Sequence, residues 1–187
     1  MFDFRGKNVL VAGGTGLIGI PLAELLIAEG AKIRIASLDD PSLAHPDAEF
    51  LRLDLLEPQN CLRVSQGMDY VFNLLCVKAS PAAAAAYPAT FFEANLLLDV
   101  LMLRAALQSG VKGYLLASSV GVYPPGREVF REEDAGGILP LTHDSGGFAK
   151  LIAERQVYYC RRQYGKNMAI SVARPCNVYG PFDDFWS

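Results

Sequence analysis

The sequence predicts an α/β fold built on a doubly wound parallel sheet of about six strands. Short runs of apolar and β-branched residues alternate with longer segments of helical periodicity, which is the pattern of βαβ units. Several of the short runs are almost continuously apolar, as expected of strands that are covered on both faces. The chain has 187 residues, 51% of them apolar, and is therefore long enough for one such domain.

The expected elements follow one another in a regular order. Strands are expected at Asn8–Ala12, Lys32–Ser37, Phe50–Leu53, Tyr70–Leu75, Gly113–Ser118 and Ala169–Ala173. Helices are expected at Leu17–Glu29, Pro58–Gln66, Thr90–Ser109 and Gly147–Tyr164. Glycines follow the first and third helices, at Gly30 and Gly110, and mark their ends. Residues 124–147 contain prolines, glycines and acidic residues, and they are expected to form a long surface loop of the kind that is usually functional.

Composition argues against several classes of protein. The apolar content excludes disorder, and a net charge of −3 with a pI of about 5.4 argues against a nucleic-acid or anionic-membrane partner. The most apolar stretch, residues 96–107, is too short to cross a membrane and contains Asp99 and Arg104. The four cysteines stand far apart, so neither a metal site nor a disulfide framework is expected. The N-terminus lacks a signal-peptide pattern, and a cytoplasmic location is the default expectation.

The first strand runs into a glycine-rich turn that opens a helix. The turn matches G-x-G-x-x-G, and its candidate cofactor-binding residues are Gly13, Gly14, Thr15, Gly16, Leu17, Ile18 and Gly19. Glycine lets the chain turn tightly and lets the backbone approach a pyrophosphate, whose charge meets the N–H groups at the start of the helix. The pattern therefore predicts a Rossmann-type site for NAD(P)(H). The alternative is a tight strand-to-helix turn without a ligand.

Further cofactor contacts are expected after the second and third strands. An acidic residue at the end of the second strand would bind the adenosine ribose, but that position falls at Ser37, with Asp39 two residues later. A serine tolerates a 2′-phosphate, so the pattern leans slightly to NADP(H). Asp39 equally suits a turn before Pro41. Asp54 and Leu55 are candidates for contact with the adenine, with a solvated turn as the alternative.

Together these residues resemble the extended short-chain dehydrogenase/reductases, and within them the NAD(P)-dependent epimerase/dehydratase family. The likeness covers nearly the whole chain. Besides the glycine turn, Asp54-Leu55 and Asn95, it rests on two segments, Ser118–Tyr123 and Arg174–Pro181. Within the family, the GDP-L-fucose synthase branch is the most similar.

The resemblance implies hydride transfer between a nicotinamide and a carbon of a nucleotide sugar. It assigns Ser119 to the reacting oxygen, and Lys150 to the nicotinamide ribose and to lowering the pKa of a tyrosine four residues earlier. The alternatives are a local cap for Ser119 and a solvated helix residue for Lys150. Tyr123 and Asn177 are expected to line the substrate site.

The expected tyrosine is missing, because Gly146 stands four residues before Lys150. No tyrosine of the chain precedes a lysine at that spacing. Three explanations remain: an introduced substitution, a natural loss of catalysis, or replacement by another group such as Asp144, His143 or Tyr123. The sequence therefore predicts an NAD(P)-binding epimerase, dehydratase or reductase with impaired catalysis. The alternatives are an inactive dinucleotide-binding sensor or scaffold and a carbonyl reductase of small substrates.

The resemblance also implies an organisation beyond the cofactor domain. Residues 1–178 are expected to form the dinucleotide-binding domain, and 179–187 to begin a truncated substrate-binding region, with aromatic residues at Phe182, Phe185 and Trp186. A homodimer joined through the two long helices is implied. Leu97, Leu101 and Val157 are the apolar positions expected on its surface.

Overall fold

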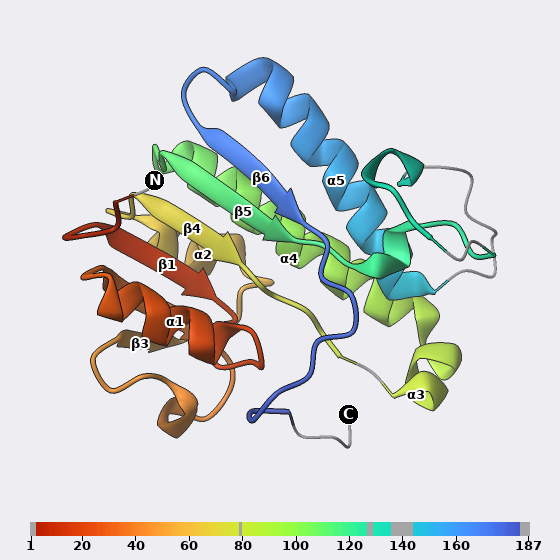
Figure 1. Ribbon diagram of the computed structural model, residues 1–187, viewed down its shortest axis with the longest axis horizontal. Coiled ribbons are helices and arrows are strands. Elements are labelled where there is room, and N and C mark those ends of the chain that lie inside the picture. Colours follow the sequence, from red (N-terminus) through yellow and green to blue (C-terminus); the bar gives the residue numbers. More distant parts are fainter. Residues whose placement is uncertain (1–2, 79, 127–128, 136–143, 184–187) are drawn as a thin grey trace.

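A single parallel sheet forms the centre of the molecule, whose computed structural model describes residues 3–78, 80–126, 129–135 and 144–183. Six strands follow the order β3-β2-β1-β4-β5-β6 (Figure 1). They are β1 Asn8–Ala12, β2 Lys32–Ser37, β3 Glu49–Arg52, β4 Tyr70–Asn73, β5 Gly113–Ala117 and β6 Ala169–Ala173. The predicted fold class is confirmed. The strand order reverses between β1 and β4, and an open α/β sheet binds its ligand at the carboxyl ends of such a pair.

Three strands, β1, β2 and β6, have the predicted bounds, and the others differ by one or two residues. The differences arise where a neighbouring strand stops. β4 ends at Asn73 because its partner residue on β1 is Ala12, the last of that strand. In the same way, β5 ends at Ala117 opposite Ala173 of β6. Leu74 still donates its N–H to the oxygen of Ala12, at 2.9 Å, but β1 ends there and the glycine turn begins.

The helices are α1 Gly19–Ala28, α2 Pro58–Ser65, α3 Pro81–Ala86, α4 Pro88–Gln108 and α5 Ser145–Tyr164. Short 3₁₀ turns occur at η1 Pro41–Leu43, η2 Val120–Val122 and η3 Glu132–Asp134. Helix α5 begins two residues before the expected start. The cause is Asp144, whose carboxylate accepts hydrogen bonds from the N–H groups of Gly146 and Gly147 and so caps the helix.

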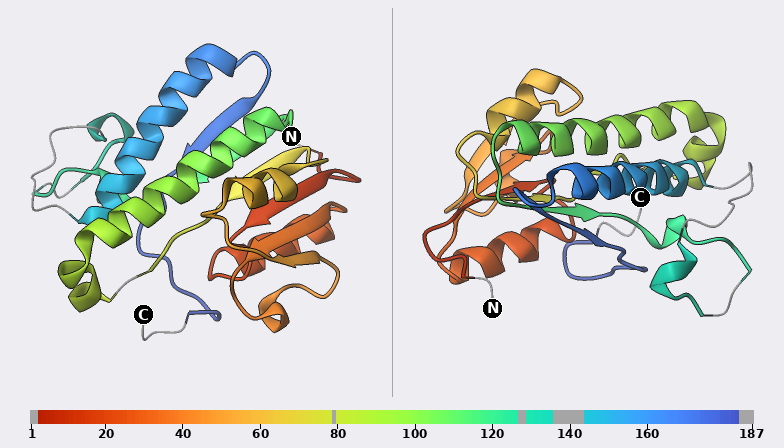
Figure 2. Two further views of the ribbon diagram at one scale, coloured as in Figure 1. Left: turned by 180° about the vertical axis from the view of Figure 1, so that it is seen from behind. Right: turned by 90° about the horizontal axis from the view of Figure 1, so that it is seen from above.

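The helices form two layers around the sheet. Helices α2, α4 and α5 lie on one face and α1 lies on the other (Figure 2). Side chains alternate along β1: Leu10 and Ala12 enter the larger core beneath α2, α4 and α5, and Val9 and Val11 enter the core beneath α1. The expected burial of the strands on both faces is therefore met at β1.

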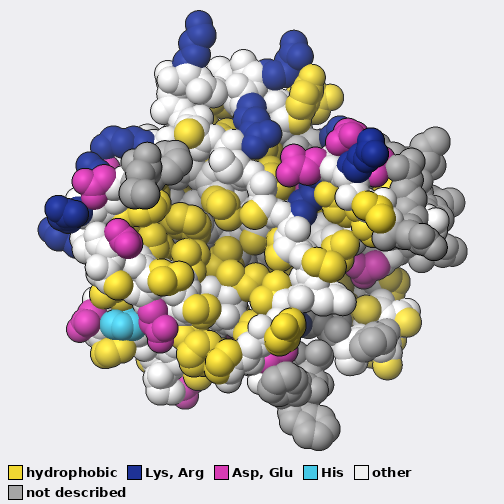
Figure 3. All heavy atoms as spheres, viewed as in Figure 1, with side chains coloured by type: hydrophobic (Ala, Val, Ile, Leu, Met, Phe, Trp, Pro, Cys, Tyr) yellow, Lys and Arg dark blue, Asp and Glu magenta, His cyan; other side chains and the backbone are white. Residues whose placement is uncertain are grey.

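The α1 side of β5 and β6 is less covered. Ala169, Ser171 and Ala173 of β6 are exposed and Leu115 of β5 is half-buried. Hydrophobic side chains gather over the middle of this face (Figure 3). Among the described residues, no helix is long and apolar enough to cross a membrane.

Candidate cofactor site

Three glycines of the turn after β1 are required by the packing of the protein itself. Gly13 has a φ of +80°, which favours glycine. A β-carbon on Gly14 would lie 2.9 Å from the Ile35 side chain, and one on Gly19 would overlap the backbone oxygen of Gly13. The glycines thus bring the start of α1 into direct contact with the end of β1.

Gly16 differs from these three glycines. Of the residues that the structure describes, a β-carbon there would meet only the Gly13 oxygen, at an ordinary 3.5 Å, and Gly16 is exposed. The protein therefore leaves an open approach to the backbone at Gly16. Helix α1 begins beside it without a side-chain cap, so the positive end of the helix is unshielded at the same place. This arrangement fits the pyrophosphate of a dinucleotide.

Polar residues from β2 connect to this turn. The buried hydroxyl of Thr15 donates a hydrogen bond to the carboxylate of Asp39, and Thr15 Oγ1 lies 2.9 Å from Ser37 Oγ. Ser37 Oγ also donates to Asp39 Oδ2, at 2.8 Å. The structure therefore brings Ser37 and Asp39 together with the glycine turn, and it places a carboxylate at the end of β2.

The residues after β3 form a turn that leads into α2. Asp54 Oδ1 accepts a hydrogen bond from the N–H of Leu56, at 2.9 Å, and the side chain of Leu55 is buried in the core. This geometry favours the turn for Asp54. Adenine contact at Asp54 and Leu55 stays a prediction.

Lys150 is buried on the sheet-facing side of α5. Its ammonium group donates to the backbone oxygen of Leu75, just beyond β4, and to Asp99 Oδ1 of α4, both at 3.0 Å. Asn73 Nδ2 donates to the same Asp99 oxygen and lies 2.9 Å from the hydroxyl of Tyr114. Burial raises the pKa of the Asp99 carboxyl despite the opposing effect of Lys150, and burial also raises the pKa of Tyr114. Because Lys150 is buried and paired, the alternative interpretation of this residue as a solvated helix residue is wrong.

Ser119 and Gly146 lie on two segments that face each other. Ser119 Oγ accepts a hydrogen bond from the N–H of Gly121 at 3.0 Å and caps η2. A β-carbon on Gly121 would lie 3.4 Å from Ser119 Oγ and 3.6 Å from Asp144 Oδ2, so these two oxygens are within about 7 Å of each other. Among the described residues, a β-carbon on Gly146 would meet only the Asp144 carboxylate, at 3.6 and 3.8 Å. The described part of the protein therefore leaves room for a side chain at position 146.

Arg174 holds the loop that follows β5. Its guanidinium pairs with both oxygens of Glu154, at 2.9 and 2.8 Å, and donates to the hydroxyl of Tyr123 at 3.2 Å. The ring of Tyr123 stacks on Phe130 with centroids 4.9 Å apart. The hydrogen bonds with Glu154 raise the pKa of Arg174 further, so this cation stays charged. The sequence did not point to Glu154 or Asp99 as parts of the site, although an aspartate in an apolar helix was a visible signal.

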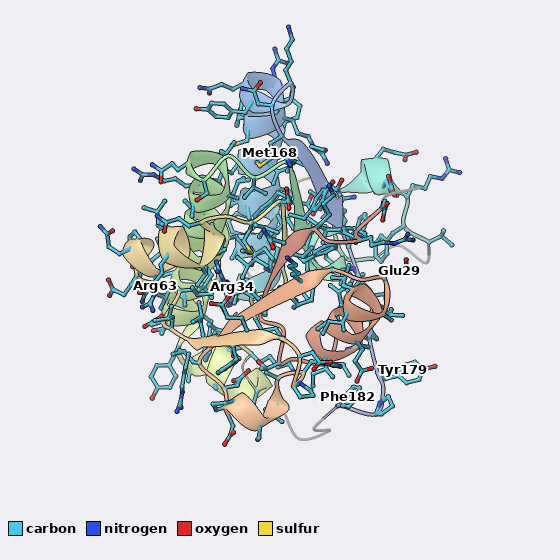
Figure 4. The ribbon with its side chains drawn as sticks, turned by 90° about the vertical axis from the view of Figure 1, so that its left-hand side faces the viewer. Glu29, Arg34, Arg63, Met168, Tyr179 and Phe182 are labelled. Atoms are coloured by element: carbon cyan, nitrogen blue, oxygen red, sulfur yellow. The ribbon has the colours of Figure 1, made fainter. Side chains whose placement is uncertain are left out.

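The segment after β6 crosses near the glycine turn. A β-carbon on Gly180 would lie 3.6 Å from Leu17. Figure 4 shows Tyr179 pointing outward, and that side chain is 86% exposed. Asn177 is exposed on the same segment, while His143, Phe185 and Trp186 lie outside the described residues. In the described part of the chain, no group of three or more His, Cys, Asp or Glu residues could hold a metal.

These features define a dinucleotide-binding fold of the Rossmann type. Over residues 9–186 the chain matches the NAD dependent epimerase/dehydratase family, and it belongs to that family. It is 31% identical to GDP-mannose 3,5-epimerase 1 of Oryza sativa subsp. japonica, over 94% of this chain and 47% of the relative. It is 28% identical to GDP-L-fucose synthase of Sinorhizobium fredii, over 99% of this chain and 56% of the relative.

A solved structure extends the comparison. UDP-glucose 4-epimerase of Thermotoga maritima, crystallised with UDP-glucose, superimposes with a TM-score of 0.83 at 26% identity, over 96% of this chain and 59% of that one. The chain spans about half the length of the curated relatives it matches. Family membership and fold are confirmed for the residues that these matches cover.

Proposed function

We propose that the chain is the NAD-binding part of an enzyme that transfers a hydride at a carbon of a nucleotide sugar. The observation that carries the proposal is the open backbone at Gly16, beside the uncapped start of α1. The names of the relatives, which act on GDP-mannose or make GDP-L-fucose, support a nucleotide sugar as the substrate. A bound nicotinamide would supply the hydride donor or acceptor.

Residues from different segments of the chain would have different roles in binding and catalysis. Backbone N–H groups at the start of α1 would bind the pyrophosphate, and Ser119 would hydrogen-bond the reacting oxygen. Tyr123 and Asn177 would line the substrate side. We place the boundary of the cofactor domain at residue 178, with 179–187 beginning the substrate-binding region, because Gly180 lies near Leu17 of the cofactor turn.

We infer a preference for NAD(H) over NADP(H). The serine at the end of β2 favoured NADP(H) in the sequence, but the Asp39 carboxylate reaches back to Thr15 and Ser37 beside the glycine turn. A carboxylate at this place would accept hydrogen bonds from a ribose and repel a 2′-phosphate.

Impaired catalysis is part of the proposal, since no hydroxyl stands at Gly146. General acid–base catalysis contributes about 10²–10⁴-fold, so a slow enzyme that binds its cofactor normally is expected. The second candidate, an inactive dinucleotide-binding sensor or scaffold, is favoured by the same glycine. Slow turnover of NADH with a panel of 4-keto nucleotide sugars would favour the enzyme, and binding without turnover would favour the sensor.

A homodimer through α4 and α5 is also proposed. The exposed apolar residues on these helices include Leu97, Phe148 and Ile152, each 38% exposed. Val157 does not belong to this surface, because it is 2% exposed and packs in the core, so the expectation for that residue was wrong. Light scattering that gives the mass of a monomer would count against the dimer.

The cofactor proposal is tested by titrating NADH and following its fluorescence, with Gly16→Ala as the variant. The added methyl fits the protein but obstructs the pyrophosphate, so we expect affinity to fall by about tenfold or more, or roughly 1.4 kcal/mol. The thermal midpoint should stay unchanged because the β-carbon meets only ordinary contacts. No binding of NADH or NADPH at millimolar concentration would refute the proposal.

A further inference from the structure

The ammonium group of Lys150 makes two directed hydrogen bonds and one close ion pair. An ammonium has three donors. In the structure Nζ donates to Leu75 O and Asp99 Oδ1, and its charge lies 2.9 Å from Asp99 Oδ2, so two of the three donors have a directed acceptor among the described residues. The whole residue is 5% exposed. The charge of Lys150 is therefore committed to Asp99 inside the core.

Asp99 is as firmly committed to this pair as Lys150. It is 1% exposed, and Asn73 donates a second hydrogen bond to Oδ1. Oδ2 is buried without a well-directed hydrogen bond among the described residues, so its compensation is the charge of Lys150 2.9 Å away. A buried carboxylate without a partner is strongly unfavourable, which keeps the two groups together.

The pair also cancels the electric field that a neighbouring hydroxyl would feel. Position 146 lies one turn before Lys150 on the same side of α5, where side chains are about 5–6 Å apart. A lone cation at such a distance lowers the pKa of an acid by about 1–3 units. Paired with Asp99, the lysine presents little net charge to that position.

We propose that Asp99 is a positioning residue that holds and neutralises Lys150, making this lysine a structural tie between α4, α5 and the end of β4. The charge of the lysine is thereby withheld from the activation of a proton donor. This inference rests on the proposed function, because only in an enzyme of that kind would Lys150 be expected to activate a proton donor. It also implies that a tyrosine restored at 146 is not sufficient for catalysis.

The first experiment measures the pKa of an introduced phenol by ultraviolet difference titration, with no cofactor present. Gly146→Tyr is compared with Gly146→Tyr/Asp99→Asn, each against its parent without the tyrosine. The nearby Asp144 carboxylate should raise the phenol pKa in both proteins, so the comparison is between them: we expect the pKa to be at least about one unit lower in the second protein than in the first. Adding Lys150→Met to the second protein should return the pKa to the value of the first.

Other results of this titration would overturn the proposal. A phenol pKa already lowered in Gly146→Tyr means that Asp99 does not neutralise the lysine. An unchanged value in both proteins means that Asp99 is not what withholds its charge.

The second experiment uses the unmodified chain and remains decisive if a variant fails to fold. Lysines are acetylated with a small reagent and quantified by mass spectrometry. Lys112 is the matched control, because it pairs with Asp69 at 2.7 Å but its side chain is 66% exposed. We expect Lys150 to react at least about tenfold more slowly than Lys112, and equal rates would overturn the proposal. Failure of NADH to bind would refute the proposed function and leave both of these measurements unaffected.

Discussion

Replacing Lys150 with methionine should destabilise the fold strongly. The substitution keeps the aliphatic stem but leaves the Asp99 carboxylate, which is 1% exposed, without its cation. Breaking a buried pair in this way costs about 3–5 kcal/mol. At roughly 2–4 °C per kcal/mol for a domain of this size, the thermal midpoint should fall by on the order of 10 °C.

The assay is thermal and urea unfolding followed by circular dichroism, with Lys112→Met as the control. The exposed pair of Lys112 with Asp69 should contribute little, so this midpoint should hardly move. The double variant Lys150→Met/Asp99→Leu should recover most of the loss, because an apolar pair of similar volume replaces the ion pair. Equal, small effects of the two lysine substitutions would refute the reasoning.

The loss in Lys150→Met should depend on pH. Burial raises the pKa of Asp99 and Lys150 lowers it, so removing the lysine raises the native pKa further. A group with a raised native pKa stabilises the fold below its unfolded pKa, about 3.9 for aspartate, and this contribution is lost as the pH rises through the native value. The destabilisation should therefore shrink as the pH falls toward 4, and a loss that is constant with pH would contradict this account.

Three further outcomes are expected. Asp39→Asn should raise the NADPH-to-NADH affinity ratio by about tenfold in a fluorescence titration, and an unchanged ratio would remove the basis for NAD preference. Gly19→Ala should lower the free energy of unfolding by about 1–3 kcal/mol or more, because its β-carbon overlaps the backbone of Gly13 and Gly14. Gly16→Ala should leave that free energy unchanged, and equal stabilities of the two variants would contradict the packing described for Gly19. Burial raises the pKa of the Cys61 thiol to about 11, so iodoacetamide at pH 8 should label the exposed Cys176 and spare Cys61, as read by peptide mass spectrometry; rapid labelling of Cys61 would show that it is accessible.

Local patterns were sufficient to predict the fold. The alternation of apolar runs with helical segments depends on neighbouring residues, so β1, β2 and β6 were placed at their observed bounds. The ends of β4 and β5 could not be predicted in this way, because they depend on where a partner strand stops. The start of α5 was wrong by two residues because the capping strength of Asp144 outweighed the low helix propensity of the two glycines.

The candidate site was predictable only where its residues are close in sequence. The glycine turn is one continuous segment, whereas the partner of Lys150 lies 51 residues away on another helix. No spacing rule connects Asp99 to Lys150, and the sheet order that brings α4 beside α5 had first to be known. The contact of Asp39 with the glycine turn could not be predicted for a related reason, because its side chain bonds to Thr15, 24 residues earlier.

The thinly covered side of β5 and β6 has a calorimetric consequence. Unfolding raises the heat capacity chiefly through newly exposed apolar surface, by about 12–15 cal/mol/K per residue in ordinary domains. Where Ser171 and its neighbours on β6 are already in water, unfolding has less surface left to expose. The isolated chain should therefore have a heat-capacity increment per residue below that range, and hence a flatter dependence of stability on temperature than a domain with both sheet faces covered.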